Sequence, residues 1–375
     1  MTTHRIKTER KEDITLKITI SGGVSFAPMD AERTEIGTLG EFGLIAELTK
    51  GLECTQDSTQ LGVGDDAAVL APAAGHRTLV STDLLCEGIH FDLTYSPLKH
   101  LGYKAVVVNL SDICAMNGTP RQIVVGLGLS NRFSVEAVKA LYEGVRLACT
   151  QYKVDLVGGD TTSSQSGLTL SVTAIGDAPE NRVVTRGGAS AGDLLVVSGE
   201  LGSAYMGLQI LEREKLVFKE APGAQPDLTG HEELLERQLK PEARTDVVEE
   251  LAKLEILPTA MIDISDGLAS EALHIAAQSG CGVKLYEDKV PMSQKMYDTA
   301  REFNLDPTLC ALSGGEDYEL LFTLPQDRFE DIRNHPMFSI IGHLTEDTGE
   351  RTLVTRNGME AELKAQGWDG LKSDS

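Results

Sequence analysis

The sequence has 375 residues, of which 41% are hydrophobic, and a formal net charge of -23. This length allows two domains of ordinary size. The acidic excess argues against non-specific binding to nucleic acid or to anionic membranes, because both need a basic surface, and no apolar run approaches the roughly 18 residues of a membrane span.

The first half of the chain predicts one domain. Residues 1–38 lack the apolar core and cleavage site of a signal peptide, and we interpret them as an extension without an assigned function. From residue 39 the hydrophobic patterns alternate between helix and strand, and we expect this domain to end at residue 186. Its predicted helices are 40–52, 101–118 and 134–152, the last with Ser134 as N-cap, and its predicted strands are 76–85, 121–130, 154–162 and 168–176. We expect the strand at 154–162 to run into a turn at Gly158-Gly159-Asp160, and no strict sequence repeat is visible.

The second half, residues 187–375, begins after the pattern break in TRGGASAGD. A strand at 194–199 leads through a Gly-rich turn into a helix, and a further helix is predicted at 243–254. Residues 260–280 read as strand, turn and helix, and 311–325 as turn and strand. Mixed strand and helix in both halves predicts an α/β or α+β fold with two domains.

The six cysteines include no CxxC pair. Free, mostly buried thiols are typical of a reducing compartment. We therefore expect the protein to be cytoplasmic.

Five short segments place a carboxylate beside a small residue, each at the end of a predicted strand or at the edge of a helix. Magnesium prefers oxygen ligands and is usually held by few carboxylates plus phosphate oxygens, so several such segments indicate a multi-metal phosphate site. Asp-Gly and Ser-Asp are also ordinary turn and N-cap chemistry, which is the better interpretation of any one segment. Five together favour a site: Gly64-Asp65-Asp66, Ser81-Thr82-Asp83, Asn109-Leu110-Ser111-Asp112, Gly158-Gly159-Asp160-Thr161 and Asp263-Ile264-Ser265-Asp266-Gly267.

Two glycine pairs, Gly158-Gly159 and Gly314-Gly315, would let backbone approach a phosphate closely. The sequence has no GxxxxGK[ST] and no GxGxxG after a first strand, so neither a P-loop nor a dinucleotide-binding fold is supported. The protein-kinase motifs are also missing.

The motifs GVGDDAAVL, STDLLCEGIHF, NLSDICAMNGTP, VGGDTT, TRGGASAGD, IDISDGL and SGGEDYEL follow one another in a fixed order. In this order the chain resembles the thiamine-monophosphate kinase family, of the superfamily that includes aminoimidazole ribonucleotide synthetase, from residue 39 to 368. The STD triplet with a histidine seven residues after its aspartate, and SGGEDYEL, are the more family-specific parts. The resemblance implies an N-terminal domain with a mostly antiparallel sheet that pairs with its twin in a homodimer, a C-terminal α/β domain, and ATP and magnesium in the cleft between them.

By motif position the resemblance also implies roles for individual residues. The implied metal ligands are Asp66, Ser81, Thr82, Asp83, Asp112, Asp160 and Asp263, with Asp266 as an acid near a metal. The implied ATP contacts are Tyr142, Gly159, Asp160, Arg186 and Ser265, and the implied thiamine-phosphate contacts are His90, Ser313 or Glu316, and Trp368.

These roles have physical reasons and simpler alternatives. An imidazole at His90 can hold a phosphate, although a lone histidine is more often structural. The guanidinium of Arg186 can clamp a polyphosphate, or can lie at the surface of a hinge. Trp368 can stack on a heterocycle or anchor the tail, and Tyr142 can belong to the core.

The implied reaction is ATP-dependent phosphorylation of thiamine monophosphate by in-line transfer, with several magnesium ions as cofactors. The attacking phosphate oxygen is already anionic, so we assign no general base, and catalysis would rest on positioning and charge neutralisation. Asp112 and Asp66 are the residues whose loss we expect to be most damaging. Two alternatives stay open: a related enzyme that uses ATP to activate a purine-pathway amide, and a non-catalytic module that binds nucleotide or metal.

Overall fold

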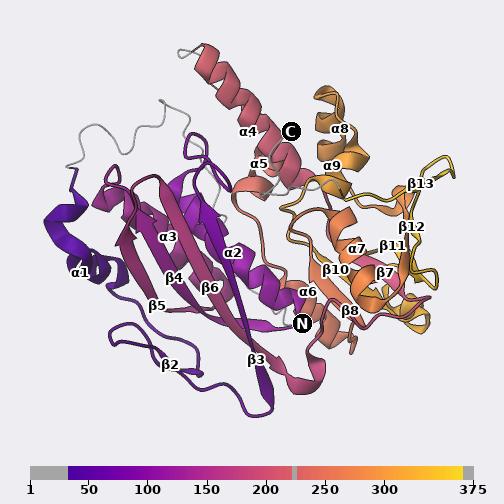
Figure 1. The fold of residues 1–375 in the computed structure, drawn as a ribbon, viewed down its shortest axis with the longest axis horizontal. Coiled ribbons are helices and arrows are strands. Elements are labelled where there is room, and N and C mark those ends of the chain that lie inside the picture. The colour runs from indigo at the N-terminus through magenta and orange to yellow at the C-terminus, as the bar shows by residue number, and fades with distance from the viewer. Residues whose placement is uncertain (1–32, 222–225, 366–375) are drawn as a thin grey trace, which may run out of the picture.

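The computed structural model describes residues 33–221 and 226–365. Figure 1 shows two domains side by side, the first containing the helices and strands up to β6 and the second those from β7 onward. Among the described residues, no helix is both long enough and apolar enough to cross a membrane. The expected two-domain arrangement with mixed helices and sheets is confirmed.

The N-terminal domain is built on a four-stranded sheet in the order β3-β6-β4-β5. β6 pairs antiparallel with both β3 and β4, whereas β4 and β5 are parallel, so the sheet is mostly antiparallel as expected. The strands are β3 (His76–Cys86), β4 (Thr119–Leu129), β5 (Asp155–Ser163) and β6 (Leu168–Pro179).

Two long helices, α2 (Leu98–Ala115) and α3 (Val135–Tyr152), pack on each other and cover one face of this sheet. Their close approach requires glycine, because a Cβ at Gly144 would lie 1.8 Å from the carbonyl oxygen of Lys99. The predicted cap of α3 is confirmed, since the Ser134 side chain accepts a hydrogen bond from the Ala137 amide.

Three smaller elements precede β3: helix α1 (Ile36–Thr49) and the short strands β1 (Thr59–Leu61) and β2 (Val69–Leu70). The first helix starts at Ile36, three residues before the point at which the globular pattern begins in the sequence.

One predicted turn is wrong. Gly158, Gly159 and Asp160 lie inside β5, where they pair with Val124, Val125 and Gly126 of β4. A Cβ at Gly159 would lie 2.2 Å from the carbonyl oxygen of Val125. Close pairing of two strands therefore explains this glycine, which the sequence had suggested for a phosphate turn.

The C-terminal domain contains a seven-stranded sheet in the order β13-β12-β9-β11-β7-β10-β8. Only the β12–β9 pair is parallel. The strands are β7 (Leu194–Ser198), β8 (Ala260–Asp263), β9 (Gly282–Tyr286), β10 (Leu320–Leu324), β11 (Phe338–Thr345), β12 (Arg351–Val354) and β13 (Glu360–Glu362).

The helices of this domain complete three hydrophobic clusters. One cluster contains side chains of α7 and α9, a second those of α6 and α10, and a third those of α4, α5 and α8. The helices are α4 (Ser203–Glu220), α5 (Glu232–Leu239), α6 (Thr245–Lys253), α7 (Leu268–Ser279), α8 (Gln294–Glu302), α9 (Pro307–Ser313) and α10 (Phe329–Ile332).

The two domains share buried residues. Cys114 and Ala115 of α2 belong to a cluster that consists otherwise mostly of C-terminal residues, and Ala243 and Tyr318 belong to the N-terminal core. Shared cores fix the position of one domain against the other, and with it the shape of the space between them.

Candidate active site

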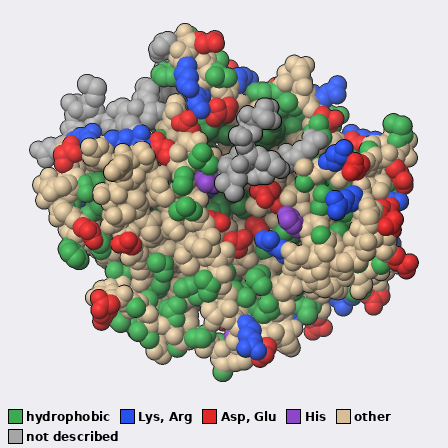
Figure 2. Space-filling view, viewed as in Figure 1, with side chains coloured by type: hydrophobic (Ala, Val, Ile, Leu, Met, Phe, Trp, Pro, Cys, Tyr) green, Lys and Arg blue, Asp and Glu red, His purple; other side chains and the backbone are tan. Residues whose placement is uncertain are grey.

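A cavity of about 890 Å³ lies between the domains. Its walls come from the end of β3, from α2, from α4, and from the segments around β8 and β10. In the view of Figure 2, acidic side chains gather in the hollow between the two halves of the molecule.

Three carboxylates from three different elements form one wall, and we call Asp83, Asp112 and Asp263 the carboxylate cluster. Asp83 is on β3, Asp112 is on α2, and Asp263 ends β8. Hydroxyl groups hold two of them: Ser81 donates to Asp112, and Ser111 Oγ donates to Asp263 Oδ2 at 2.7 Å.

The carboxylates of this cluster disfavour each other's charge. Burial raises the pKa of Asp83 to about 6, and the nearby Asp112 adds to the shift. Burial also raises the pKa values of Asp112 and Asp263; for Asp263 the charge of Asp112 adds to the effect. The hydroxyl bonds and the Arg186 guanidinium oppose these shifts without reversing them. A cation placed here would relieve this repulsion.

The whole cavity has the same imbalance of charge. Eight carboxylates line it, those of Asp83, Asp92, Asp112, Glu212, Asp263, Asp266, Asp306 and Glu316, against only two lysines, Lys104 and Lys215. Within residues 33–221 and 226–365, no three His, Cys, Asp or Glu side chains converge as a preformed metal cage. Magnesium is commonly held by one or two carboxylates together with substrate phosphates, and the carboxylate cluster fits that kind of binding.

The turn between β8 and α7 brings two further predicted residues, Ser265 and Asp266, to the cavity. Gly267 has φ of 122°, a backbone conformation that favours glycine. Below the turn, the Asp266 amide donates to Glu271 Oε1 at 3.0 Å. Burial raises the pKa of Glu271 to about 8, with Asp266 and Asp263 adding to the shift. The buried carboxyl group of Glu271 therefore stabilises the turn.

Residues 313–319, which we call the glutamate loop, bring Ser313 and Glu316 to the same cavity. Glu316 and Tyr318 have φ of 59° and 52°, in the left-handed region that non-glycine residues rarely adopt. Two backbone bonds pin the loop to the β8–α7 turn, from the Glu316 amide to Ser265 O and from the Tyr318 amide to Ile264 O. Ser265, a predicted nucleotide contact, and Ser313 and Glu316, the predicted substrate contacts, thus lie on two connected loops.

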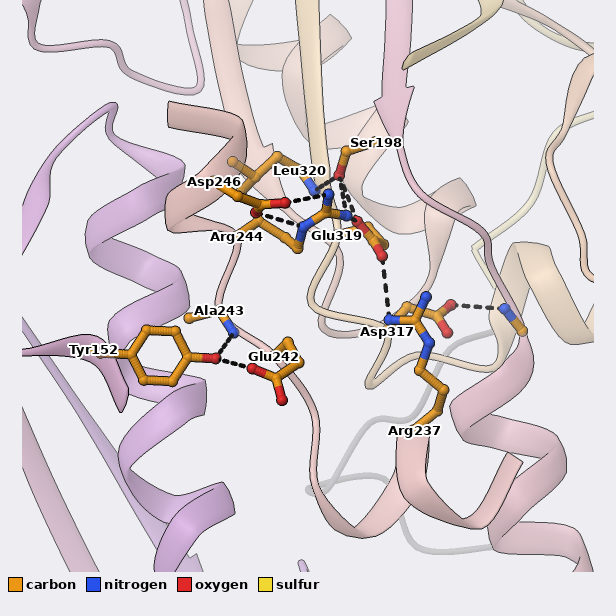
Figure 3. A network of polar contacts seen from close by, with 11 residues as sticks. Tyr152, Ser198, Arg237, Glu242, Ala243, Arg244, Asp246, Asp317, Glu319 and Leu320 are labelled. Carbon is orange, nitrogen blue, oxygen red and sulfur yellow. Dashed lines mark hydrogen bonds and ion pairs between the residues drawn. The ribbon is translucent and has the colours of Figure 1, made fainter. Parts of the chain in front are cut away.

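A buried ionic network supports the glutamate loop, as Figure 3 shows. Glu319 is fully buried and accepts hydrogen bonds from Arg244, from Arg237 at 3.3 Å and from Ser198 Oγ at 2.6 Å. Asp317 accepts from the Gly202 amide at 2.9 Å. Two residues before Arg244, Glu242 accepts a hydrogen bond from Tyr152 of the N-terminal domain.

The predicted histidine lies where it can meet a substrate. His90 lines the cavity, and its Nδ1 accepts a hydrogen bond from the Cys86 amide at 3.0 Å. Beside it, Lys215 of α4 contacts Asp92 Oδ2 at 2.8 Å and joins the second domain to the segment that carries His90.

Several predicted residues lie elsewhere. Thr82 is on the opposite face of β3 from Ser81 and Asp83, and its hydroxyl bonds to Val172 O. Asp160 lines a hollow on the open face of the sheet, which is the face that α2 and α3 do not cover, and Gly126 and Ser171 line the same hollow. Asp66 is exposed, in the connection between β1 and β2.

Two of the expected ATP contacts are also absent from the residues that line the cavity. Tyr142 is in the hydrophobic core, where burial raises its pKa to about 12, so the structure supports the simpler interpretation of this residue. Gly159 is within β5 and is not among the residues that line the cavity. Trp368 lies outside the described residues.

Sequence reasoning missed Lys104 and Gln238, which both line the cavity. Lys104 had a signal, because it is the one charged residue between Leu101 and Asn109 of α2, and it lies about two turns before Asp112. Gln238 had none, since its role depends on where α5 packs.

The comparisons with known proteins agree with this geometry. Family models of the AIR synthase related protein match the chain in two parts, the N-terminal domain model over residues 64–178 and the C-terminal domain model over 190–355. The chain is thus a two-domain protein of the AIR synthase related class.

Comparison with individual relatives identifies the family within this class. Thiamine-monophosphate kinase of Aquifex aeolicus is 36% identical over 88% of this chain and 97% of its own length. A solved thiamine-monophosphate kinase of Stenotrophomonas maltophilia has a TM-score of 0.70 at 31% identity, covering 85% of this chain and 95% of that one. A structure of AaThiL complexed with AMPPCP and TMP has a TM-score of 0.66 at 34% identity, covering 92% and 99%. The chain therefore belongs to the thiamine-monophosphate kinase family.

Proposed function

We propose that this protein transfers the γ-phosphoryl group of ATP to the phosphate of thiamine monophosphate, which yields thiamine diphosphate and ADP. The observation that carries the proposal is the cavity between the domains, where a carboxylate cluster with raised pKa values faces the predicted substrate residues. A relative of similar fold has been solved with an ATP analogue and TMP.

Both substrates carry anionic phosphate groups, and most of the charged side chains that line the cavity are carboxylates. The carboxylate cluster would hold magnesium, with Ser81 and Asp266 beside it. When bound, magnesium would supply the positive charge that neutralises the phosphates and the transition state. The protein's own carboxylates would otherwise repel both substrates.

The protein's remaining residues position the reactants. Arg186, whose charge lowers the pKa values of Asp112 and Asp263, would contact phosphate oxygens through its guanidinium group. His90 presents its imidazole to the cavity, with Nδ1 already bonded to the Cys86 amide. The attacking phosphate oxygen carries its own charge, so the direct in-line transfer requires no general base.

The test is product formation from the purified protein with ATP, magnesium and thiamine monophosphate, resolved by chromatography, with free thiamine as a parallel substrate. The proposal expects thiamine diphosphate and ADP from the monophosphate only. Metal-dependent ATP binding without product from either compound would contradict the kinase and favour a binding module.

We also propose that the open face of the N-terminal sheet pairs with a second copy of the chain. Val80 and Leu84 lie on this face of β3 with 65% and 56% of their surfaces exposed, and exposed apolar side chains grouped on a sheet indicate an interface. The double variant Val80→Asp/Leu84→Asp should shift the mass measured by light scattering from dimer to monomer. A wild-type protein that is monomeric at micromolar concentration would contradict this arrangement.

A further inference from the structure

Lys104 is a basic side chain buried between the two domains. It lies on α2, where most of its neighbours are apolar, and only 7% of its surface is exposed. Burying an ammonium group is unfavourable unless it is paired and hydrogen-bonded. Both conditions are met from the other domain, by Glu316 Oε1 at 2.8 Å and by the carbonyl oxygen of Gln238 at 3.0 Å.

The second oxygen of the Glu316 carboxylate is also held. Gln238 Nε2 donates to Glu316 Oε2 at 2.6 Å. A carboxylate has about four lone-pair positions, so each oxygen keeps capacity for one more partner. Lys104, Gln238 and Glu316 all line the cavity, and this is where such a partner would lie.

The backbone of Glu316 is as constrained as its side chain. Its left-handed conformation is unfavourable for a non-glycine residue, and its amide is bonded to Ser265 O at 2.7 Å. Strain of this kind persists only where neighbouring groups over-determine the conformation. Side chain and backbone together fix the direction in which the carboxylate points.

We propose that Lys104 and Gln238 are positioning residues that orient the Glu316 carboxylate toward the heterocyclic end of the substrate. This inference rests on the proposed function. The charge of Glu316 repels phosphate, so the phosphate end of thiamine monophosphate belongs at the carboxylate cluster and its metal. A fixed carboxylate suits the opposite end, where thiamine carries a cationic thiazolium ring and an aminopyrimidine.

A purely structural role for Lys104, as a tie between the domains, makes a different prediction. Lys240 provides the matched control, because it also connects the two domains. It contacts Glu242 Oε1 at 3.1 Å and lies over the ring of Tyr103 in the N-terminal domain. Glu242 in turn accepts hydrogen bonds from Tyr103 and Tyr152. Lys240 is not among the residues that line the cavity. Lys240→Met therefore weakens the same domain boundary without touching Glu316.

The experiment is a double-mutant cycle in steady-state kinetics, with thiamine monophosphate varied at saturating ATP and magnesium. Lys104→Met should raise the KM for thiamine monophosphate about tenfold, a coupling of about 1.4 kcal/mol. It should change kcat and the KM for ATP less than about threefold. In a Glu316→Gln background the same substitution should add no further increase, because Lys104 acts through that carboxylate. Lys240→Met should leave the KM for thiamine monophosphate unchanged.

Three results would overturn the inference: additive effects of Lys104→Met and Glu316→Gln, an equal rise of both KM values, or the same change in Lys240→Met. If urea unfolding shows that Lys104→Met does not fold, the cycle is run with Gln238→Leu, which removes only the donor to Oε2, and the same criterion applies. Wild-type turnover is measured first. Its absence refutes the proposed function and this inference with it, whereas turnover with additive variants refutes only the inference.

Discussion

The carboxylates at the cavity form two groups with opposite surroundings, which we call its two ends: the carboxylate cluster, and Glu316 with the residues behind it, the paired end. In the carboxylate cluster, Asp112 and Asp263 have hydroxyl partners, and burial together with mutual repulsion raises the pKa values of the cluster. At the other end, Glu316 contacts the Lys104 ammonium and the Gln238 amide. The fully buried Glu319 behind it contacts two arginines.

The difference separates two uses of acidic residues. Carboxylates without a cationic side chain against them destabilise the empty site, and they are suited to a cation that arrives with the substrates. Carboxylates with fixed partners are oriented before any ligand arrives, which suits recognition and support. Substitutions at the two ends should therefore change stability in opposite directions.

The largest effect is expected for Asp112→Asn. Loss of this proposed metal ligand should lower kcat at least about 10³-fold, about 4 kcal/mol of transition-state stabilisation. In the absence of magnesium the same variant should melt at a higher temperature than the wild type at pH 8, because a buried like charge has been removed. Kinetics and calorimetry on one protein sample measure both.

Asp155→Asn is the matched control for the stability part. Burial raises the pKa of Asp155, but hydrogen bonds from Thr55, Gln56 and Thr59 outweigh it, so the pKa is lowered and the charged form is favoured. This variant should lose about 1–3 kcal/mol. Near wild-type turnover of Asp112→Asn with ordinary magnesium dependence would contradict the metal-binding role of the cluster.

The next largest effect tests the paired end. Arg244→Leu would leave the buried Glu319 carboxylate with only Arg237 and Ser198, and breaking a buried pair costs about 3–5 kcal/mol. Urea unfolding should show this loss. Replacing both partners, in Arg244→Leu/Glu319→Leu, should recover a large part of it, because no buried charge is then left unpaired. A double variant as unstable as the single one would show that packing of Arg244, and not its charge, supports the loop.

Much of the carboxylate cluster was predictable from the sequence, whereas the paired end was not. Asp83, Asp112 and Asp263 each follow or end a segment with a strong hydrophobic pattern, so local sequence predicts both the element and the position of the acid. The partners of Glu316 come from α2 and α5, about 212 and 78 positions away in the chain. Which distant side chains meet depends on how the domains pack, and the local sequence does not encode that.

One error and one untested expectation had local causes. Thr82 was grouped with Ser81 and Asp83, and its role as a metal ligand stays a prediction, although alternation along a strand places its side chain on the other face. Gly158-Gly159-Asp160 was read as a turn, although all three residues pair with β4, and the lack of a Cβ at Gly159 allows its close approach to Val125. A glycine pair identifies a place where backbone comes close to something, and only the fold shows whether that is a phosphate or another strand.

The smallest effect concerns the pH dependence of stability at Asp317, which lies in the glutamate loop and accepts from the Gly202 amide. Burial raises its pKa to about 7, with Glu319 adding to the shift, whereas an unfolded aspartate has a pKa of about 3.9. The folded protein therefore binds this proton more tightly, and the free energy of unfolding should fall as pH rises from about 4 to about 7. Asp317→Asn keeps the acceptor and removes the charge, so its free energy of unfolding should not show this decline. Measured by urea unfolding, its stability relative to the wild type should increase by about 1 kcal/mol or more between pH 5 and 8.

Asp92→Asn is the control. The pKa of Asp92 is about 2, because Lys215 and Thr94 outweigh its burial, so the change in the free energy of unfolding caused by Asp92→Asn should be the same at pH 5 and pH 8. Parallel profiles for wild type and Asp317→Asn would mean that Asp317 stays charged throughout this range, and that the arginines behind the glutamate loop stabilise it as they stabilise Glu319.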